Sequence, residues 1–161
     1  MADASAARSI LAAGTQAPDF TLASGLDSKL TLSSLRGNPV ILAFYPADWS
    51  SVCGDQLVLY NQVLPMFKQA NATLLGISVD SVFCHQAFKE ARNLNFDLLA
   101  DFEPKGTVAK EYGAYASALG MCERALFVID KHGVIAWSYL SPMGENPGAD
   151  GILNALEKLP A

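Results

Sequence analysis

Residues 40–53 read VILAFYPADWSSVC and join an apolar run to a polar segment that contains one cysteine. The run 40–45 is apolar at successive positions, which is typical of a central parallel strand covered on both faces. Residues 74–79, LLGISV, repeat this pattern. Between the two runs, apolar side chains recur at steps of three and four residues, at Leu57, Tyr60, Leu64 and Phe67. This spacing predicts a helix over 52–70, kinked at Pro65, between two buried strands.

The rest of the chain continues the alternation of strands and helices. The expected elements are a helix over 80–93, a strand over 96–100, a helix over 105–112, strands over 125–129 and 134–139, and a helix over 148–159. Asp80 or Ser81 can cap the first of these helices. The residues expected on its inner face are Ala87, Phe88 and Ala91. Residues 130–133, DKHG, indicate the turn of a hairpin. This order predicts an α/β fold, a central mixed sheet with helices on both faces, as in a thioredoxin-like architecture.

The composition limits the classes to which the chain can belong. Its 161 residues suit one domain, which we expect over 12–161, after a loosely ordered segment of small and polar residues at 1–11. The net charge of −5, without a cluster of Lys and Arg, argues against a surface for nucleic acid. No apolar run is long enough to span a membrane, and the N-terminus lacks the pattern of a secretory signal. We therefore expect a cytoplasmic protein without a membrane partner.

The three cysteines are Cys53, Cys84 and Cys122, and none lies in a Cys-x-x-Cys pair or a zinc-ligand spacing. Reduced thiols are therefore expected. Cys53 stands where a predicted strand has ended and a helix begins, so unpaired backbone N–H groups and the helix dipole favour its thiolate. The alternative is a small buried apolar residue, which is what most lone cysteines are. The polar neighbours of Cys53 argue against that alternative, because ligands usually bind at this edge of an α/β sheet.

Two residues ahead of Cys53 suit a pocket over a reactive thiol. Pro46 fixes a backbone dihedral and has no N–H group to satisfy. The Ser50 hydroxyl both donates and accepts a hydrogen bond, which suits a substrate with an O–H group and a second oxygen. It can also cap the helix, and the two roles are compatible. We expect both residues beside Cys53.

The pattern Pro46-x-x-x-Ser50-x-x-Cys53 resembles the active-site signature of peroxiredoxins, Pro-x-x-x-(Thr/Ser)-x-x-Cys. Residues 14–22, GTQAPDFTL, and 124–130, RALFVID, resemble further landmarks of this family in the expected order. Residues 98–115, LLADFEPKGTVAKEYGAY, are most similar to the alkyl hydroperoxide reductase E and bacterioferritin-comigratory subgroup. The resemblance implies a thiol peroxidase with the thioredoxin fold.

The resemblance also implies roles for individual residues. Cys53 would be the peroxidatic cysteine, and Arg124 would be its cationic partner. Gln56 stands where the family commonly has Glu or Gln. The expected substrate-binding residues are Pro46, Ser50, Val52, Gln56 and Arg124. The family likeness further implies no cofactor, a thioredoxin-like or glutaredoxin-like reductant, and a homodimer.

Arg124 is also placed by the predicted sheet. If strand 125–129 runs antiparallel to strand 40–45, its beginning lies at the edge where the other strand ends. The guanidinium would then approach Cys53 and stabilise both the thiolate and the oxygen displaced during attack. The alternative is a surface arginine paired with Glu123.

Cys84 is the first candidate for a second, resolving cysteine. It follows Cys53 by 31 positions (84 − 53) and begins a helix at the same predicted sheet edge. With neighbouring strands the two sulfurs would lie about 10 Å apart, so the turn around Cys53 would have to unwind before a disulfide forms. The alternative buries Cys84 on the apolar face of its helix. Cys122, close to Arg124, is a weaker resolving candidate.

The histidines do not suggest a different chemistry. His85 and His132 offer no complete metal-ligand set with Cys84, and neither shows the orienting partner that a Cys-His hydrolase needs. His132 is expected in an exposed turn, and Trp137 and Tyr139 are expected to pack. We favour a peroxidase in which Cys84 resolves the oxidised Cys53. The alternatives are resolution by an external thiol, a thioredoxin-type disulfide oxidoreductase, and a non-enzymatic redox sensor or holdase.

Overall fold

The central sheet is built around the two apolar runs of the sequence. In the computed structural model, which describes residues 9–160, strand β3 (Val40–Phe44) pairs in parallel with β4 (Thr73–Ser78), and β4 pairs in parallel with β5 (Asp97–Ala100). Every residue of β3 is buried, as a strand covered on both faces requires. The carboxyl ends of these strands therefore meet at one edge of the sheet.

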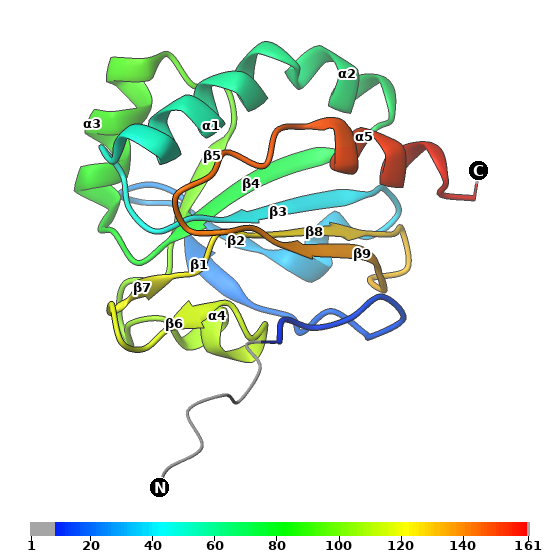
Figure 1. Ribbon diagram of the computed structural model, residues 1–161, viewed down its shortest axis with the longest axis horizontal. Helices are drawn as coiled ribbons and strands as arrows, with labels where there is room; N and C mark the ends of the chain where they lie inside the picture. Colours follow the sequence, from blue (N-terminus) through cyan, green and yellow to red (C-terminus); the bar gives the residue numbers. More distant parts are fainter. Residues whose placement is uncertain (1–8, 161) are drawn as a thin grey trace, which may run out of the picture.

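Antiparallel strands complete the sheet on both sides, in the order β2-β1-β5-β4-β3-β8-β9 (Figure 1). Strand β8 (Ala125–Ile129) pairs with β3 and forms the expected hairpin with β9 (Ile135–Leu140). The other side is formed by β1 (Thr21–Ala23) and β2 (Lys29–Thr31), and a separate small sheet by β6 (Tyr115–Ala116) and β7 (Met121–Cys122). The turn of the hairpin contains Gly133 at a φ of 84°, a conformation that favours glycine.

Helices cover both faces of this mixed sheet, as predicted (Figure 1). One face carries α1 (Ser51–Gln62), α2 (Leu64–Gln69), α3 (Val82–Arg92) and α5 (Asp150–Glu157). The other carries α4 (Thr107–Glu111) and the 3-10 helix η1 (Leu32–Leu35). None of the described helices combines the length and the apolar character that crossing a membrane requires.

The predicted helix over 52–70 is two helices. The chain breaks at Val63, and Pro65 lies in the first turn of α2 rather than inside one long helix. A proline has no N–H for an intrahelical bond but is accepted where that N–H would have no partner. Pro65 therefore lies at the beginning of a second helix, whereas the sequence predicted only a kink in one helix.

The prediction for the inner face of α3 is wrong at two positions. Phe88 is buried, but Ala87 and Ala91 are exposed, and the second buried residue of the helix is His85. Two alanines remove little apolar area from water, whereas the His85 ring makes hydrogen bonds to Asp48 and to the Leu99 carbonyl. These bonds accompany a rotation of the helix that apolar spacing did not predict.

The beginning of the described chain packs against the domain. The Leu11 N–H donates to the Tyr112 carbonyl at 3.1 Å, and Ile10 packs on the same side of the sheet as α4. Most of the segment predicted to be loosely ordered, residues 1–8, lies outside the described residues.

Candidate active site

Cys53 is the third residue of α1, immediately beyond the carboxyl edge of β3. Ser50 is the N-cap of this helix, and its Oγ accepts a hydrogen bond from the Cys53 N–H at 3.3 Å. Capping is thus the role that the structure gives the Ser50 hydroxyl. The Cys53 side chain is 0 % exposed. A substrate that reaches its sulfur must therefore be small, or the first turn of α1 must open.

The structure brings Arg124 to the sulfur. Because Phe44 pairs with Ala125, Arg124 lies beside the end of β3, where the predicted antiparallel pairing places it. Its Nη1 donates to Cys53 Sγ at 3.3 Å, and the residue is only 2 % exposed. The alternative of a surface arginine is therefore wrong. A guanidinium at this distance can stabilise negative charge that develops at the sulfur or on an oxygen bound beside it.

The guanidinium is held from two further directions. Its Nε and Nη2 donate to the Met143 carbonyl at 3.1 and 2.8 Å, and its Nη1 also donates to Gln56 Oε1 at 2.7 Å. Met143 belongs to the segment between β9 and α5, which passes over the face that carries α1 (Figure 1). The planar donor fork of arginine suits such fixed contacts better than a lysine ammonium would.

Gln56 is in turn bonded to Tyr60, a residue that sequence reasoning assigned only to the apolar stripe. Gln56 Nε2 donates to the Tyr60 hydroxyl at 3.1 Å, and that hydroxyl donates to the Gly148 carbonyl at 3.0 Å. Burial raises the pKa of Tyr60 to about 12, so the hydroxyl keeps its proton at neutral pH. The spacing from Cys53 to Gln56 and Tyr60, three and then four residues, was the available signal, because it places all three on one helix face.

Comparison with known proteins shows the family to which the chain belongs. The family model described as the AhpC/TSA family matches residues 13–138. The chain is 33% identical to alkyl hydroperoxide reductase E of Mycobacterium tuberculosis over 137 residues, which cover 84% of this chain and 90% of that protein. The chain is a peroxiredoxin of the AhpC/TSA family. Members of this family are thiol-dependent hydroperoxide reductases.

Two further relatives support the family and the predicted fold. Peroxiredoxin Q of Oryza sativa, a chloroplastic protein, is 38% identical over 127 residues, which are 78% of this chain and 58% of the rice protein. The chain thus spans little more than half of that relative. The crystal structure of peroxidoxin BcpB from M. tuberculosis has a TM-score of 0.84 at 29% identity, covering 94% of this chain and 99% of that one. Since these relatives are chloroplastic and bacterial, the cytoplasmic location stays a prediction.

Two predicted pocket residues lie near Cys53 in the chain. Pro46 is the second residue after β3 and is buried, and Val52 is the half-buried second residue of α1. The backbone between them is strained at Trp49, whose φ is 69° in the left-handed region. The Trp49 ring meets the Phe88 ring edge-on at 5.2 Å, which ties this loop of the peroxiredoxin site to α3. Binding of a peroxide by Pro46 and Val52 stays a prediction.

Cys84 is the third residue of α3 and is half-buried. The Ser81 Oγ accepts from its N–H at 3.2 Å, and its Sγ lies 4.0 Å from Asp80 Oδ1. Burial, followed by the nearby carboxylates of Asp48 and Asp80, raises the pKa of the Cys84 thiol to about 11. The alternative of an apolar helix face is therefore wrong, because the neighbours of this sulfur are carboxylates.

His85 has an orienting partner that the sequence did not reveal. Its Nδ1 lies 2.7 Å from Asp48 Oδ2 and its Nε2 lies 3.0 Å from the Leu99 carbonyl, while the Tyr45 hydroxyl donates to Asp48 Oδ1 at 2.6 Å. The expectation of an unpartnered histidine is wrong for His85. A carbonyl can only accept, so Nε2 donates, and both ring nitrogens are engaged. This histidine has no free nitrogen with which to activate a thiol.

The side chains of Asp48, Asp80 and Cys84 offer three possible metal ligands, with ligand atoms within 4.8 Å of one another. The oxygens are already used within the protein. Both Asp48 oxygens face Tyr45 and His85, and Asp80 Oδ2 accepts from the Asp48 N–H and the Ser78 hydroxyl. The hydrogen bonds of this cluster therefore stabilise the loop after β3.

Cys122 lies on the other side of the sheet from Cys53. It is fully buried in the core beneath α4, and burial together with nearby carboxylates raises the pKa of its thiol. Cys53 belongs to the core on the α1 side. This separation weakens Cys122 further as a resolving candidate.

The remaining predictions concern residues away from the thiols. His132 is exposed in the hairpin turn, as expected. Trp137 packs against the core on the α1 side, while Tyr139 is exposed and stacks on the Trp137 ring at 6.1 Å. Packing is thus confirmed for Trp137 and limited to one ring face for Tyr139.

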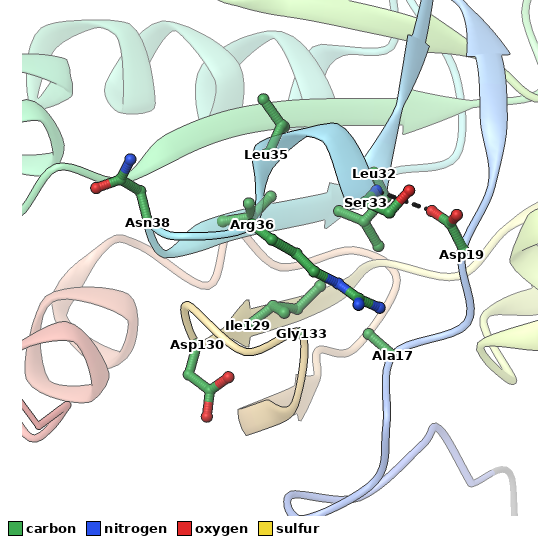
Figure 2. A pocket seen from close by; sticks show the side chains of 11 residues that line it. Ala17, Asp19, Leu32, Ser33, Leu35, Arg36, Asn38, Ile129, Asp130 and Gly133 are labelled. Carbon is green, nitrogen blue, oxygen red and sulfur yellow. Dashed lines mark hydrogen bonds between the residues drawn. The ribbon is translucent and has the colours of Figure 1, made fainter.

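A small cavity lies at the opposite end of β3 from Cys53. Figure 2 shows Arg36 extending across it, with the bond from the Ser33 N–H to Asp19 at its side. Its volume is about 10 Å³, which is space for about one water molecule. The cavity is too small for an organic substrate and lies away from the thiols.

Proposed function

We propose that the chain reduces hydrogen peroxide and organic hydroperoxides with Cys53 as the peroxidatic nucleophile. The single observation that supports this most is the 3.3 Å contact from Arg124 Nη1 to Cys53 Sγ at a buried position. The helix N-terminus beneath Cys53 favours the same anion. Membership of the peroxiredoxin family supports the assignment of the reaction.

In the proposed first step the Cys53 thiolate attacks the O–H oxygen of the hydroperoxide. A sulfur–oxygen bond forms and the O–O bond breaks, which leaves sulfenic acid on Cys53 and an oxyanion that takes a proton from solvent to become water or an alcohol. Arg124 stabilises the developing negative charge on the departing oxygen. Ser50, Pro46, Val52 and Gln56 are proposed to shape the space for the peroxide. The reaction needs no cofactor.

We further propose that Cys84 resolves the sulfenic acid. The Cys84 thiol attacks the oxidised sulfur, a disulfide forms, and the hydroxyl leaves with the thiol proton as water. Pairing of β3 with β4 supports this, since both cysteines then begin helices at one sheet edge. The buried first turn of α1 must unwind for the sulfurs to meet. A thioredoxin-like or glutaredoxin-like dithiol then reduces the disulfide.

A second route is favoured by the raised pKa of the Cys84 thiol, because few Cys84 side chains are thiolates at neutral pH. In that route an external thiol attacks the sulfenic acid directly. The homodimer and the cytoplasmic location belong to the same proposal, and sedimentation of the purified protein tests the former.

Stopped-flow measurement of peroxide consumption tests the first step. We expect Cys53→Ser to abolish the reaction, and Cys84→Ser and Cys122→Ser to retain a single turnover. A Cys53→Ser protein as active as the wild type would refute the mechanism and favour a non-enzymatic role. Activity as a disulfide reductase without peroxide would favour the thioredoxin-type alternative.

Mass spectrometry of peptides from peroxide-treated protein tests the resolving step. We expect a peptide that joins Cys53 to Cys84, and its absence from Cys84→Ser. An intact Cys53 sulfenic acid, or its adduct with an added thiol, in the wild type would establish the external-thiol route. A bridge to Cys122 would contradict both routes.

A further inference from the structure

We propose that Tyr60 is a positioning residue for the reaction of Cys53 with peroxide, because it fixes which end of the Gln56 amide faces Arg124. This inference rests on the proposed function of Cys53. It assigns to Tyr60 a role beyond core packing, because the tyrosine lies two helical turns from the sulfur and acts on Arg124 through Gln56.

The direction of each hydrogen bond follows from the groups involved. The Gly148 carbonyl can only accept, so the Tyr60 hydroxyl donates its proton there, at 3.0 Å. The hydroxyl oxygen is then an acceptor for Gln56 Nε2 at 3.1 Å. With its nitrogen turned to Tyr60, the amide presents Oε1 to Arg124 at 2.7 Å.

Removal of the Tyr60 hydroxyl takes away one of the two bonds that favour this orientation and leaves only the bond from Arg124 Nη1 to Gln56 Oε1. The Gln56 amide could then rotate by half a turn, because its oxygen and nitrogen have nearly the same size. A rotated amide would place N–H donors opposite the Arg124 Nη1 donor. Arg124 would lose one of its three acceptors and move relative to the sulfur, which its Nη1 contacts at 3.3 Å.

The surroundings make this orientation rigid. Gln56 and Tyr60 are both 0 % exposed, so water is not available to replace a lost partner. Gly148 has a φ of 70°, a conformation suited to glycine, in the same segment that supplies the Met143 carbonyl to Arg124. One segment, 141–149, therefore supports the guanidinium directly through Met143 and indirectly through Tyr60.

A glutamate at position 56 would not need this help. Both oxygens of a carboxylate accept hydrogen bonds, so either orientation would serve Arg124. The proposed role of Tyr60 therefore applies only when residue 56 is glutamine. It can be separated from a packing role by a double-mutant cycle between positions 56 and 60.

The test measures the second-order rate constant for peroxide oxidation of Cys53 in Tyr60→Phe, Gln56→Glu and the double variant. Loss of one buried hydrogen bond in the chain predicts a fall of about five- to tenfold for Tyr60→Phe. In the Gln56→Glu background, the same Tyr60→Phe change is expected to alter the rate constant by less than about twofold. An equal loss in both backgrounds would assign Tyr60 a packing role only and overturn the proposal.

Tyr112→Phe is the matched control. Its hydroxyl also donates to a backbone carbonyl, that of Pro18 at 2.6 Å, but on the other face of the sheet. We expect this variant to lose a similar amount of thermal stability and to keep the wild-type rate constant. Tyr60→Phe at the wild-type rate, with Cys53→Ser inactive, would overturn this proposal alone. A wild-type protein that does not consume peroxide would instead overturn the proposed function.

Discussion

Cys53 and Cys84 occupy the same local structure and opposite electrostatic surroundings. Each is the third residue of a helix that follows one of two adjacent parallel strands, and each N–H donates to a capping serine, at 3.3 and 3.2 Å. Arg124 lies against the first sulfur, whereas Asp48 and Asp80 lie near the second. The helix N-terminus is therefore common to both, and the tertiary charges distinguish them.

The surroundings of the two cysteines also share a buried tyrosine, which is hydrogen-bonded to the side chain next to the thiol. Tyr60 bonds Gln56 near Cys53, and Tyr45 bonds Asp48 near Cys84. Both tyrosines are fully buried. The comparison indicates that a serine cap and a buried hydroxyl do not make a nucleophilic thiol by themselves. The proposed function therefore assigns the difference in reactivity between the two thiols to the sign of the charge beside each sulfur.

The largest effect is expected from removal of the positive charge beside Cys53. Arg124→Met should lower the rate constant for peroxide by about 100-fold or more, because it removes the donor aimed at the developing oxyanion. Stopped-flow oxidation measures this loss. Arg36→Met, at the opposite end of β3, is the control and should retain the wild-type rate. Comparable rates for both variants would show that the charge beside Cys53 is not what activates it.

Removal of a negative charge should move Cys84 in the other direction. Asp80→Asn is expected to lower the pKa of the Cys84 thiol, since the Asp80 carboxylate is one cause of its rise to about 11. A shift of one pH unit would raise alkylation of Cys84 at pH 8 about tenfold, measured with iodoacetamide in a Cys53→Ser, Cys122→Ser background. Asp55→Asn, an exposed position on α1, should leave the rate unchanged. An unchanged rate in Asp80→Asn would mean that burial and the Asp48 carboxylate, without a contribution from Asp80, suppress Cys84.

Alkaline pH should destabilise the regions around both cysteines alike, because each region contains a buried tyrosine. Burial raises the pKa of Tyr60 to about 12 and raises the pKa of Tyr45 well above its usual value. Both residues keep their protons in the folded protein above pH 10, while the unfolded chain loses them, so the free energy of unfolding falls as pH rises from 10. The expected loss is about 1 kcal/mol per tyrosine at pH 11.

Thermal unfolding between pH 8 and 11.5 measures this loss. Tyr60→Phe and Tyr45→Phe should each make the decline less steep. A decline of wild-type steepness in either variant would show that its tyrosine titrates alike in the folded and unfolded chain.

The smallest expected effects concern the caps. Ser50→Ala and Ser81→Ala should each reduce the free energy of unfolding by about 1 kcal/mol, the usual contribution of an N-cap side chain. Chemical denaturation measures both. Only Ser50→Ala should also slow the peroxide reaction, because Ser50 holds the turn that carries Cys53. An equal decrease of the peroxide rate in Ser81→Ala would contradict the expectation that only the region around Cys53 carries the peroxide reaction.

Several features were predictable because they depend on local pattern. The apolar runs predicted β3 and β4, and the sequence of Ser50 and Cys53 predicted a thiol at a helix start. The position of Arg124 beside Cys53 was predicted on the condition that strand 125–129 runs antiparallel to strand 40–45, and the structure shows this pairing. The break at Val63 was not predicted, because a single apolar stripe continues through both helices.

Other features required the folded chain. Apolar periodicity assigned Ala87 and Ala91 to the inner face of α3, but the helix is rotated toward the bonds between His85 and Asp48. Tyr60 counted only as an apolar position, because nothing near it in sequence indicates an acceptor 88 residues away at Gly148.

By itself, the sequence determined the order of strands and helices and the placement of Cys53 and Cys84 at helix starts, because these depend on side-chain periodicity and capping within a few residues. The tertiary structure alone decided the surroundings of the two sulfurs. Arg124 and the Met143 carbonyl come from the far end of the chain, and Asp48 approaches Cys84 from the loop between β3 and α1. The charge at a thiol depends on distances through space, and only packing of the sheet and its helices fixes those distances.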